Sequence, residues 1–192
     1  MTTSISTITI TSPSVMNPET ASPPRSAMQV FRMLPEGTLA EVIENTLYMS
    51  PAPSPLHQEV SMRLATTINQ FITRGKLGKL FAAPIDVFLD ADSNVVQPDL
   101  VFVGKTNPLV IDETGLHGVP EFIIEILSRS NQKHDLVKKK RLYEKFGVTE
   151  YWVVDPWSRR VTGFQLTSKG YRVIEEANGE ISSVLFRHSF KF

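Results

Sequence analysis

The chain has 192 residues, which is enough for one sizeable domain and short for two. Hydrophobic residues make up 41% and charged residues 21%, as in ordinary globular proteins, and 20 basic residues balance 20 acidic ones. This balance excludes a protein that coats nucleic acid through net charge alone. The absence of cysteine excludes disulfides, thiolate zinc sites and cysteine nucleophiles, and it suits a reducing compartment, so we expect a cytoplasmic protein.

The first stretch, "MTTSISTITITSPSVMNPETASPPRSAM", is rich in serine, threonine and proline. It lacks the basic and then apolar pattern of a signal peptide, so residues 1–27 are predicted to form a flexible tail. Residues 28–192 are predicted to form a single domain. No apolar run approaches the roughly 20 residues needed to cross a bilayer, so we expect no membrane association.

The domain begins with a predicted hairpin in "GTLAEVIENTLYMS", residues 37–50, with its turn near Glu44 and Asn45. A proline-rich loop leads into a helix predicted over residues 57–74, where apolar residues recur every three to four positions and Gly75 ends the helix. "KLFAAPIDVFLD" and "NVVQPDLVFVG" then predict two strands joined by a turn at "ADSN".

Further along, "EFIIEILS" is apolar on both faces and predicts a central buried strand. A helix follows over residues 131–146, with Ser130 as its expected cap and Gly147 at its end. "EYWVVDP" predicts another buried strand, and "RVTGFQL" with "YRVIEE" predicts a terminal hairpin. This order indicates an α/β (α+β) fold with a mixed sheet.

Two acids interrupt the apolar rows of these strands. Asp99 follows Pro98 in "VVQPDLVFVG", where strand alternation groups it with the valines, and Glu125 shares a face with Ile123 and Leu127. Each acid alone could be structural, bonded to backbone N–H groups. Two acids on consecutive strands favour a shared site, in which a cation between them offsets their repulsion.

A basic residue lies in the apolar face of the second helix. At 100° per residue, Leu136, Leu142, Tyr143 and Phe146 share that face, and Lys139 points to its middle. Lys139 could extend its ammonium to solvent, or it could reach the two acids. Two acids and a lysine suit metal-assisted hydrolysis of a phosphodiester, with Mg²⁺ or Mn²⁺ held by oxygen ligands.

"QPDLVFV" followed by "VPEFIIEILSRSNQKHDLVKKKRLYEKFGVTEYWVVDP" resembles the Uma2 family of putative restriction endonucleases, also called DUF820, within the PD-(D/E)XK nuclease superfamily. Upstream, "LAEVIENTLYMSPAPSPLHQEV" is similar to the family's early segment. The resemblance covers roughly residues 30–170. It implies a restriction-endonuclease-like core, a mixed sheet flanked by helices with additional hairpins.

The resemblance implies catalytic roles for four residues and metal binding by two of them. The superfamily aspartate corresponds to Asp99 and its second acid to Glu125, and both would bind the metal. The usual lysine position holds Leu127, so the lysine is expected from the following helix, at Lys139. Glu41 corresponds to the early glutamate.

Three accessory residues follow from the same resemblance: His57, Asp135 and Tyr143. Each has an ordinary structural alternative. His57 could cap its helix or lie on the surface, Asp135 could favour the helix dipole, and Tyr143 could simply pack in the core. Glu41, likewise, could be an exposed strand residue.

The sequence therefore predicts a divalent-metal-dependent endonuclease acting on DNA, with a homodimer among the expected assemblies because two strands must be cut. One alternative is a non-catalytic nucleic-acid-binding or interaction module on the same scaffold, since a fold does not define a function. Another is a hydrolase that uses its acids as an acid/base pair, as in glycoside cleavage.

Overall fold

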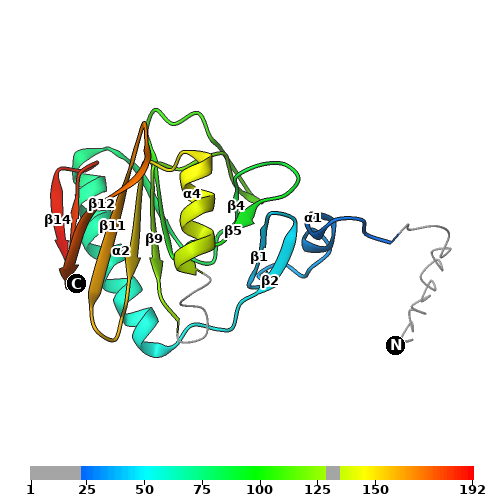
Figure 1. Ribbon diagram of the computed structural model, residues 1–192, viewed down its shortest axis with the longest axis horizontal. Coiled ribbons are helices and arrows are strands. Elements are labelled where there is room, and N and C mark those ends of the chain that lie inside the picture. The colour runs from blue at the N-terminus through cyan, green and yellow to red at the C-terminus, as the bar shows by residue number, and fades with distance from the viewer. Residues whose placement is uncertain (1–22, 129–134) are drawn as a thin grey trace, which may run out of the picture.

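The computed structural model describes residues 23–128 and 135–192 (Figure 1). Most of the expected tail and Ser130 therefore lie outside the described residues. The main sheet is mixed, because β9 and β10 run parallel while its other neighbouring pairs are antiparallel. In spatial order its strands are β12 (Gly170–Asn178), β11 (Arg160–Thr167), β10 (Glu150–Val154), β9 (Phe122–Ile126), β6 (Leu100–Gly104) and β3 (Gly78–Ala82).

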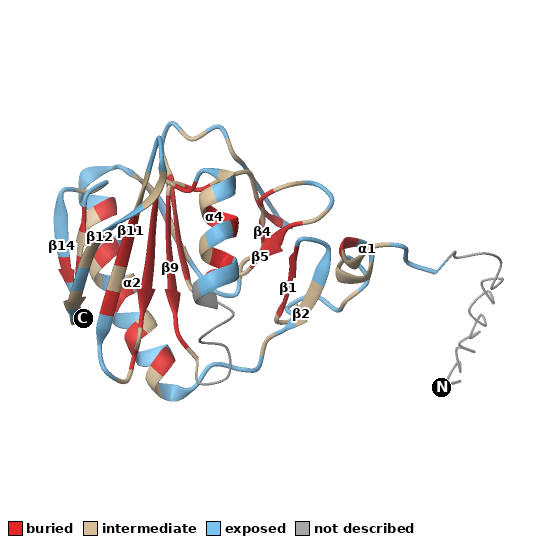
Figure 2. Ribbon diagram, in the orientation of Figure 1, coloured by how far each residue is buried: buried red, intermediate tan, exposed pale blue. Residues whose placement is uncertain are grey.

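The two predicted buried strands, β9 and β10, lie in the middle of this sheet, and every residue of both is buried (Figure 2). Their continuous apolar sequences suit strands that are covered on both faces. The predicted terminal hairpin is also confirmed, as β11 and β12. A further pair, β13 (Glu180–Ser183) and β14 (His188–Lys191), follows it and was not expected.

One helix covers each face of the main sheet. Helix α2 (Pro55–Gly75) packs through Val60, Leu64, Ile68 and Ile72, which recur at four-residue intervals as the sequence predicts. Helix α4 (Lys140–Phe146) lies on the opposite face, in front of the sheet in Figure 1. The alternating residues of the central strands therefore divide between two cores, and Glu125 faces α4.

The end of α2 differs from the expectation. Gly75 remains helical, and Lys76 is the residue in the left-handed conformation, with φ 51° and ψ 40°. A Cβ on Gly75 would lie 2.9 Å from Cγ of Leu77. The exposed side chain of Leu77 can move away, so this contact favours glycine without requiring it, and the left-handed residue that reverses the chain is Lys76.

The two strands predicted around the "ADSN" turn are each divided, so the expectation of two continuous strands is wrong. Residues 79–90 form β3 and then β4 (Val87–Phe88), and residues 94–104 form β5 (Val95–Val96) and then β6. The turn joins β4 to β5, but β3 and β6 belong to the main sheet and β4 and β5 to a second one. Pro98 and Asp99 occupy the crossing, where proline's missing N–H breaks no ladder.

The N-terminal hairpin belongs to a second sheet, which shares the core on the α4 side with the main sheet. Its strands, in spatial order, are β2 (Thr46–Met49), β1 (Ala40–Ile43), β5, β4, β8 (Gly115–His117) and β7 (Val110–Asp112). The hairpin β1–β2 turns at Glu44 and Asn45, both with positive φ, as predicted. Ile43, Val96 and Leu116 join the core on the α4 side, while α1 (Ala27–Phe31) covers the other face.

The second predicted helix is described from residue 135. Its described part consists of a π-helical segment, η1 (Asp135–Lys139), followed by α4, and it ends at Gly147 with φ 92°, as expected. The wider π turn immediately precedes the α-helix, and such irregularities often occur at functional sites. Among residues 23–128 and 135–192, no helix is both long enough and apolar enough to cross a membrane.

Candidate functional site

A buried lysine joins two buried glutamates. Nζ of Lys139 lies 2.8 Å from Oε1 of Glu41 and 3.0 Å from Oε1 of Glu125. The exposed fractions are only 4% for Lys139, 6% for Glu41 and 4% for Glu125. Lys139 therefore does not extend to solvent, and Glu41 is not an exposed strand residue. Pairing offsets the high cost of burying these charges.

Tyr143 completes this charged cluster. Its hydroxyl donates a 2.6 Å hydrogen bond to Oε1 of Glu125 from one turn further along the helix than Lys139. Burial, followed by the negative charges of Glu125 and Glu41, raises the pKa of Tyr143 well above its usual value. Tyr143 therefore keeps its proton and acts as a donor, and its ring also packs edge-to-face on Tyr151.

Asp99 lies beside this cluster and binds two partners. Its Oδ2 accepts a 2.6 Å hydrogen bond from the backbone N–H of Ile126, and its Oδ1 lies 3.2 Å from Nε2 of His57. The first bond is what a structural acid would make, so that alternative stays open for Asp99. It also ties Asp99 to the residue after Glu125.

His57 is buried near the start of α2, and the capping side chain there is Ser54, whose Oγ accepts from the His57 N–H. The surface and capping alternatives for His57 are therefore wrong. Burial, the largest influence, would lower its pKa, but the hydrogen bond and charge of Asp99 outweigh it, so the pKa is raised above 6.5. Nδ1 of His57 has no hydrogen-bond partner within the described part of the chain.

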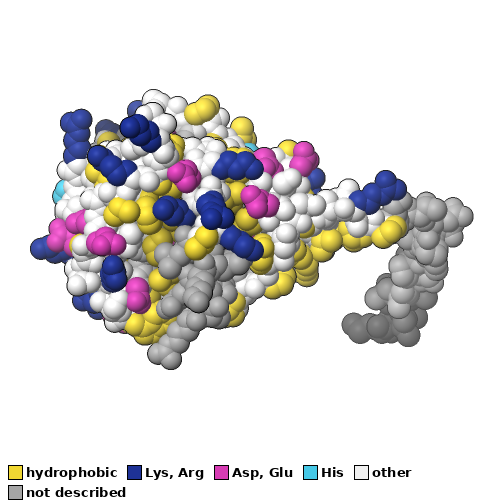
Figure 3. Space-filling view, in the orientation of Figure 1, with side chains coloured by type: hydrophobic (Ala, Val, Ile, Leu, Met, Phe, Trp, Pro, Cys, Tyr) yellow, Lys and Arg dark blue, Asp and Glu magenta, His cyan; other side chains and the backbone are white. Residues whose placement is uncertain are grey.

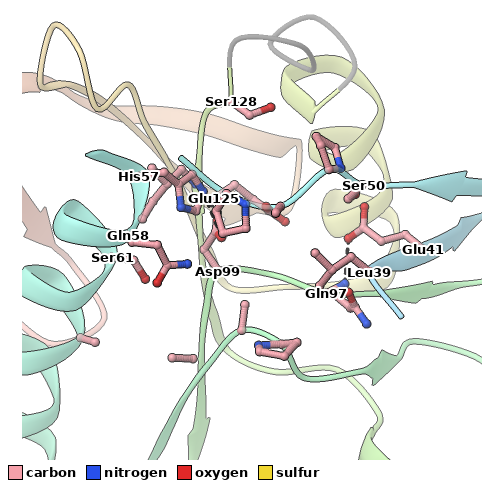
Figure 4. Close-up of a pocket in the computed structure, with 18 of the residues that line it drawn as sticks. Leu39, Glu41, Ser50, His57, Gln58, Ser61, Gln97, Asp99, Glu125 and Ser128 are labelled. Carbon is pink, nitrogen blue, oxygen red and sulfur yellow. Dashed lines mark hydrogen bonds and ion pairs between the residues drawn. The ribbon is translucent and has the colours of Figure 1, made fainter. Parts of the chain in front are cut away.

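The three acids, Lys139 and His57 line one cavity of about 400 Å³. Figure 4 shows His57, Asp99 and Glu125 close together, with Glu41 approaching from the second sheet. Glu41, His57, Asp99, Glu125 and Lys139 come from five segments of the chain, and all line the cavity. The volume falls within the range of small-molecule and cofactor sites.

The structure adds two residues that the sequence did not predict: Gln97, which positions Glu41, and Asp86, which positions the side chain of Gln97. The backbone N–H of Gln97 donates a 2.7 Å hydrogen bond to Oε1 of Glu41. Its side-chain amide donates to Oδ1 of Asp86 at 2.7 Å and to the carbonyl of Thr38 at 3.2 Å. Burial raises the pKa of Asp86, while the hydrogen bond from Gln97 acts in the opposite direction. The sequence feature that could have pointed to Gln97 is a polar glutamine inside the apolar run before Pro98.

Two site predictions remain, the accessory role of Asp135 and the origin of the lysine from the helix. Asp135 belongs to η1, but its side chain lies outside the described residues. Leu127, at the usual lysine position, is buried in the core on the α4 side, so the ammonium in this cavity indeed comes from the helix. The catalytic and metal-binding roles themselves stay predictions.

Basic side chains gather over α4 on the face shown in Figure 3. Lys138, Arg141 and Lys145 are exposed there. Lys138 directly precedes the buried Lys139, and its Nζ donates a 2.7 Å hydrogen bond to the hydroxyl of Tyr48. The exposed cations thus begin one residue from the charged cluster.

The fold is that of a nuclease-like α+β protein. It matches the crystal structure of a putative nuclease belonging to DUF820 from Anabaena variabilis ATCC 29413, with a TM-score of 0.69 and 17% sequence identity, covering 85% of this chain and 92% of that one. A family model described as Uma2, putative restriction endonuclease, matches residues 28–190, and the chain belongs to this family. No curated protein matches the chain.

Proposed function

We propose that this protein is a divalent-metal-dependent endonuclease that hydrolyses phosphodiester bonds in DNA. The observation that carries the proposal is the buried Glu41–Lys139–Glu125 cluster, which lines the same cavity as Asp99. The membership of the Uma2 family and the nuclease-like fold support the same chemistry.

The carboxylates of the cavity suit a magnesium-like ion for which the protein would supply only some of the ligands. The described residues contain no group of three or more His, Asp or Glu side chains arranged to hold a metal. Mg²⁺, however, is usually bound by one or two carboxylates, with waters and substrate phosphates as the other ligands. Asp99 and Glu125 would be those two carboxylates, because both line the cavity and each carboxylate offers about four acceptor positions.

A bound Mg²⁺ or Mn²⁺ would polarise the scissile phosphate and make an attacking water more acidic. The side chains of this protein supply the other parts of the mechanism. The ammonium of Lys139, fixed between Glu41 and Glu125, would stabilise the negative charge that grows on the phosphate. Tyr143 would hold Glu125 in one orientation through its hydroxyl.

The direct test is cleavage of DNA by purified protein with Mg²⁺, with Mn²⁺ and with EDTA. Glu125→Gln and Lys139→Met are each expected to lower the rate by about 100-fold or more, as removal of a preorganised charge does elsewhere. The matched control is Glu59→Gln, which changes an exposed glutamate paired with Arg63 on α2 and should leave the rate unchanged. Equal cleavage by wild type and Glu125→Gln would identify a contaminating nuclease and refute the proposal.

One observation favours the second candidate, a non-catalytic binding module. The ammonium of Lys139 already pairs with both glutamates, so their charge is partly compensated without a metal. Titration calorimetry with Mn²⁺ separates the two candidates. DNA binding that weakens with salt, in the absence of Mn²⁺ binding, would favour the binding module.

The oligomeric state is part of the same proposal. Cleavage of both strands of a duplex would be served by a homodimer that presents two sites. Light scattering coupled to size-exclusion chromatography, with and without DNA, measures the assembly directly, and a monomer under both conditions would exclude this arrangement.

A further inference from the structure

The cavity extends beyond its charged floor into a region with different chemistry. Its outer walls are formed by small apolar, proline and methionine side chains from α2 and from two exposed loops: Pro51, Ala52, Pro53, Met62, Ala83 and Pro84. Such walls suit an uncharged, largely apolar group beside the acids.

Two polar side chains on α2 enter this apolar region. Gln58 and Ser61 are three residues apart, so they lie on one face of the helix, and they project into the cavity (Figure 4). Within residues 23–128 and 135–192, neither side chain has a hydrogen-bond partner. The amide of Gln58 can donate and accept at once, and the hydroxyl of Ser61 can do either. Gln58 is exposed and Ser61 half-buried, so in the free protein both groups face solvent, and a bound group could use them in place of water.

The charges of the cavity indicate which part of a nucleotide would enter it. Among the described residues that line it, Lys139 is the one lysine or arginine, and its ammonium is held by Glu41 and Glu125 on the floor. His57, the other basic side chain of the lining, is paired with Asp99 beside that floor, so the outer walls themselves present no lysine or arginine to a phosphate. The exposed cations lie on η1 and α4, at Lys138 and Arg141. Phosphates would thus follow that basic surface, and the uncharged part of one nucleotide would occupy the outer region of the cavity.

We propose that this outer region, lined by Gln58, Ser61 and Met62, binds an unpaired nucleobase next to the scissile phosphate, so that the substrate is single-stranded DNA or a duplex with an unpaired nucleotide. The inference rests on the proposed nuclease function. A base in a stacked pair cannot enter a cavity of about 400 Å³, because its partner and neighbours remain attached. Enzymes that bind an extruded base use the same combination of apolar walls and edge hydrogen bonds.

Cleavage and binding are measured on four labelled substrates of one sequence: a single strand, a complete duplex, a duplex with one bulged nucleotide, and a single strand carrying one abasic position. The single strand and the bulged duplex are expected to be cut about tenfold faster than the complete duplex, because no pair has to be opened. Binding is followed by fluorescence anisotropy with Glu125→Gln, so that the probe stays intact.

Gln58→Ala is expected to weaken both reactions on the single strand by about three- to tenfold, the equivalent of one hydrogen bond. It should leave an oligonucleotide that is abasic at the bound position unaffected. The matched control is Gln70→Ala, an exposed glutamine on the same helix that does not line this cavity. Met62→Ala removes an apolar contact instead. It should weaken binding of the single strand regardless of which hydrogen-bonding groups the base presents.

The outcomes separate this inference from the proposed function. Complete duplex cut as fast as single strand, with Gln58→Ala equal to wild type, overturns the base site and leaves the nuclease. Single-strand binding that depends on Gln58 but not on Gln70, without any cleavage, supports the base site and contradicts the nuclease. Absence of both cleavage and single-strand binding overturns both proposals.

Discussion

Replacing Lys139 with methionine tests the charged cluster most directly. Methionine keeps much of the length of the side chain but removes the ammonium that lies 2.8 Å from Glu41 and 3.0 Å from Glu125. Two carboxylates, 6% and 4% exposed, would then face each other without a counter-charge. Removing one partner of a buried ion pair costs about 3–5 kcal/mol. Because the cavity gives water access to the cluster, we expect the lower end, about 3 kcal/mol.

The free energy of unfolding is measured by urea denaturation at about pH 7.5 and about pH 5. The loss in Lys139→Met should shrink at the lower pH, since a protonated carboxyl requires no counter-charge. Lys139→Met combined with Glu125→Gln should recover part of the loss, because one of the two acids becomes neutral. The control is Lys145→Met, an exposed lysine on α4, which should change stability by no more than about 0.5 kcal/mol.

If Lys139→Met and Lys145→Met unfold at the same urea concentration, the ion pairs contribute nothing measurable. The electrostatic argument for the site would then fail. A loss that is equal at both pH values would instead point to packing around the methionine, not to the unpaired acids.

Three further predictions concern other buried groups. Tyr143→Phe removes the donor to Glu125 and should cost about 1.5–3 kcal/mol in urea denaturation, and an unchanged midpoint would contradict that bond. Burial raises the pKa of Glu150 above 4.5, although Trp152 and a backbone N–H donate hydrogen bonds to its carboxylate. The contribution of Glu150 to the free energy of unfolding is therefore complete below about pH 4.5 and is lost as the pH rises through the folded-state pKa. Glu150→Gln should therefore gain stability relative to wild type between about pH 4 and about pH 7, and a pH-independent difference would refute this. Gly163→Ala places a Cβ 2.5 Å from the ring of the fully buried Trp152 and should cost about 1–3 kcal/mol, with an unshifted thermal midpoint as the contrary result.

Several features of the site could be predicted from the sequence because they depend on local periodicity. The 100° spacing of the apolar residues placed Lys139 on the same helix face as Tyr143 and left open whether its ammonium reaches solvent, and the structure shows Lys139 buried. The face of Glu125 followed from strand alternation in the same way. Neither inference required knowledge of what lies across the sheet.

Other features could not be predicted because they depend on contacts between distant segments. Residues 79–90 and 94–104 read as two long strands, since apolar alternation does not record which partner a strand pairs with. Both runs leave one sheet and enter another, and Pro98 marks the crossing only once the second sheet is known. The end of α2 falls at Lys76, one residue after Gly75, where the backbone N–H groups of Lys76 and Leu77 donate to the carbonyls of Thr73 and Ile72.

The sequence by itself determined the central buried strands, the amphipathic helices, the two interrupting acids and the place of Lys139 on the apolar face of its helix. Each of these depends on the 2- or 3.6-residue period of its own segment. Only the tertiary structure decided that Glu41 meets Lys139, that His57 pairs with Asp99, and that Gln97 holds Glu41 in place. Those contacts join residues many positions apart, and their geometry depends on how two sheets, α2 and η1 pack together.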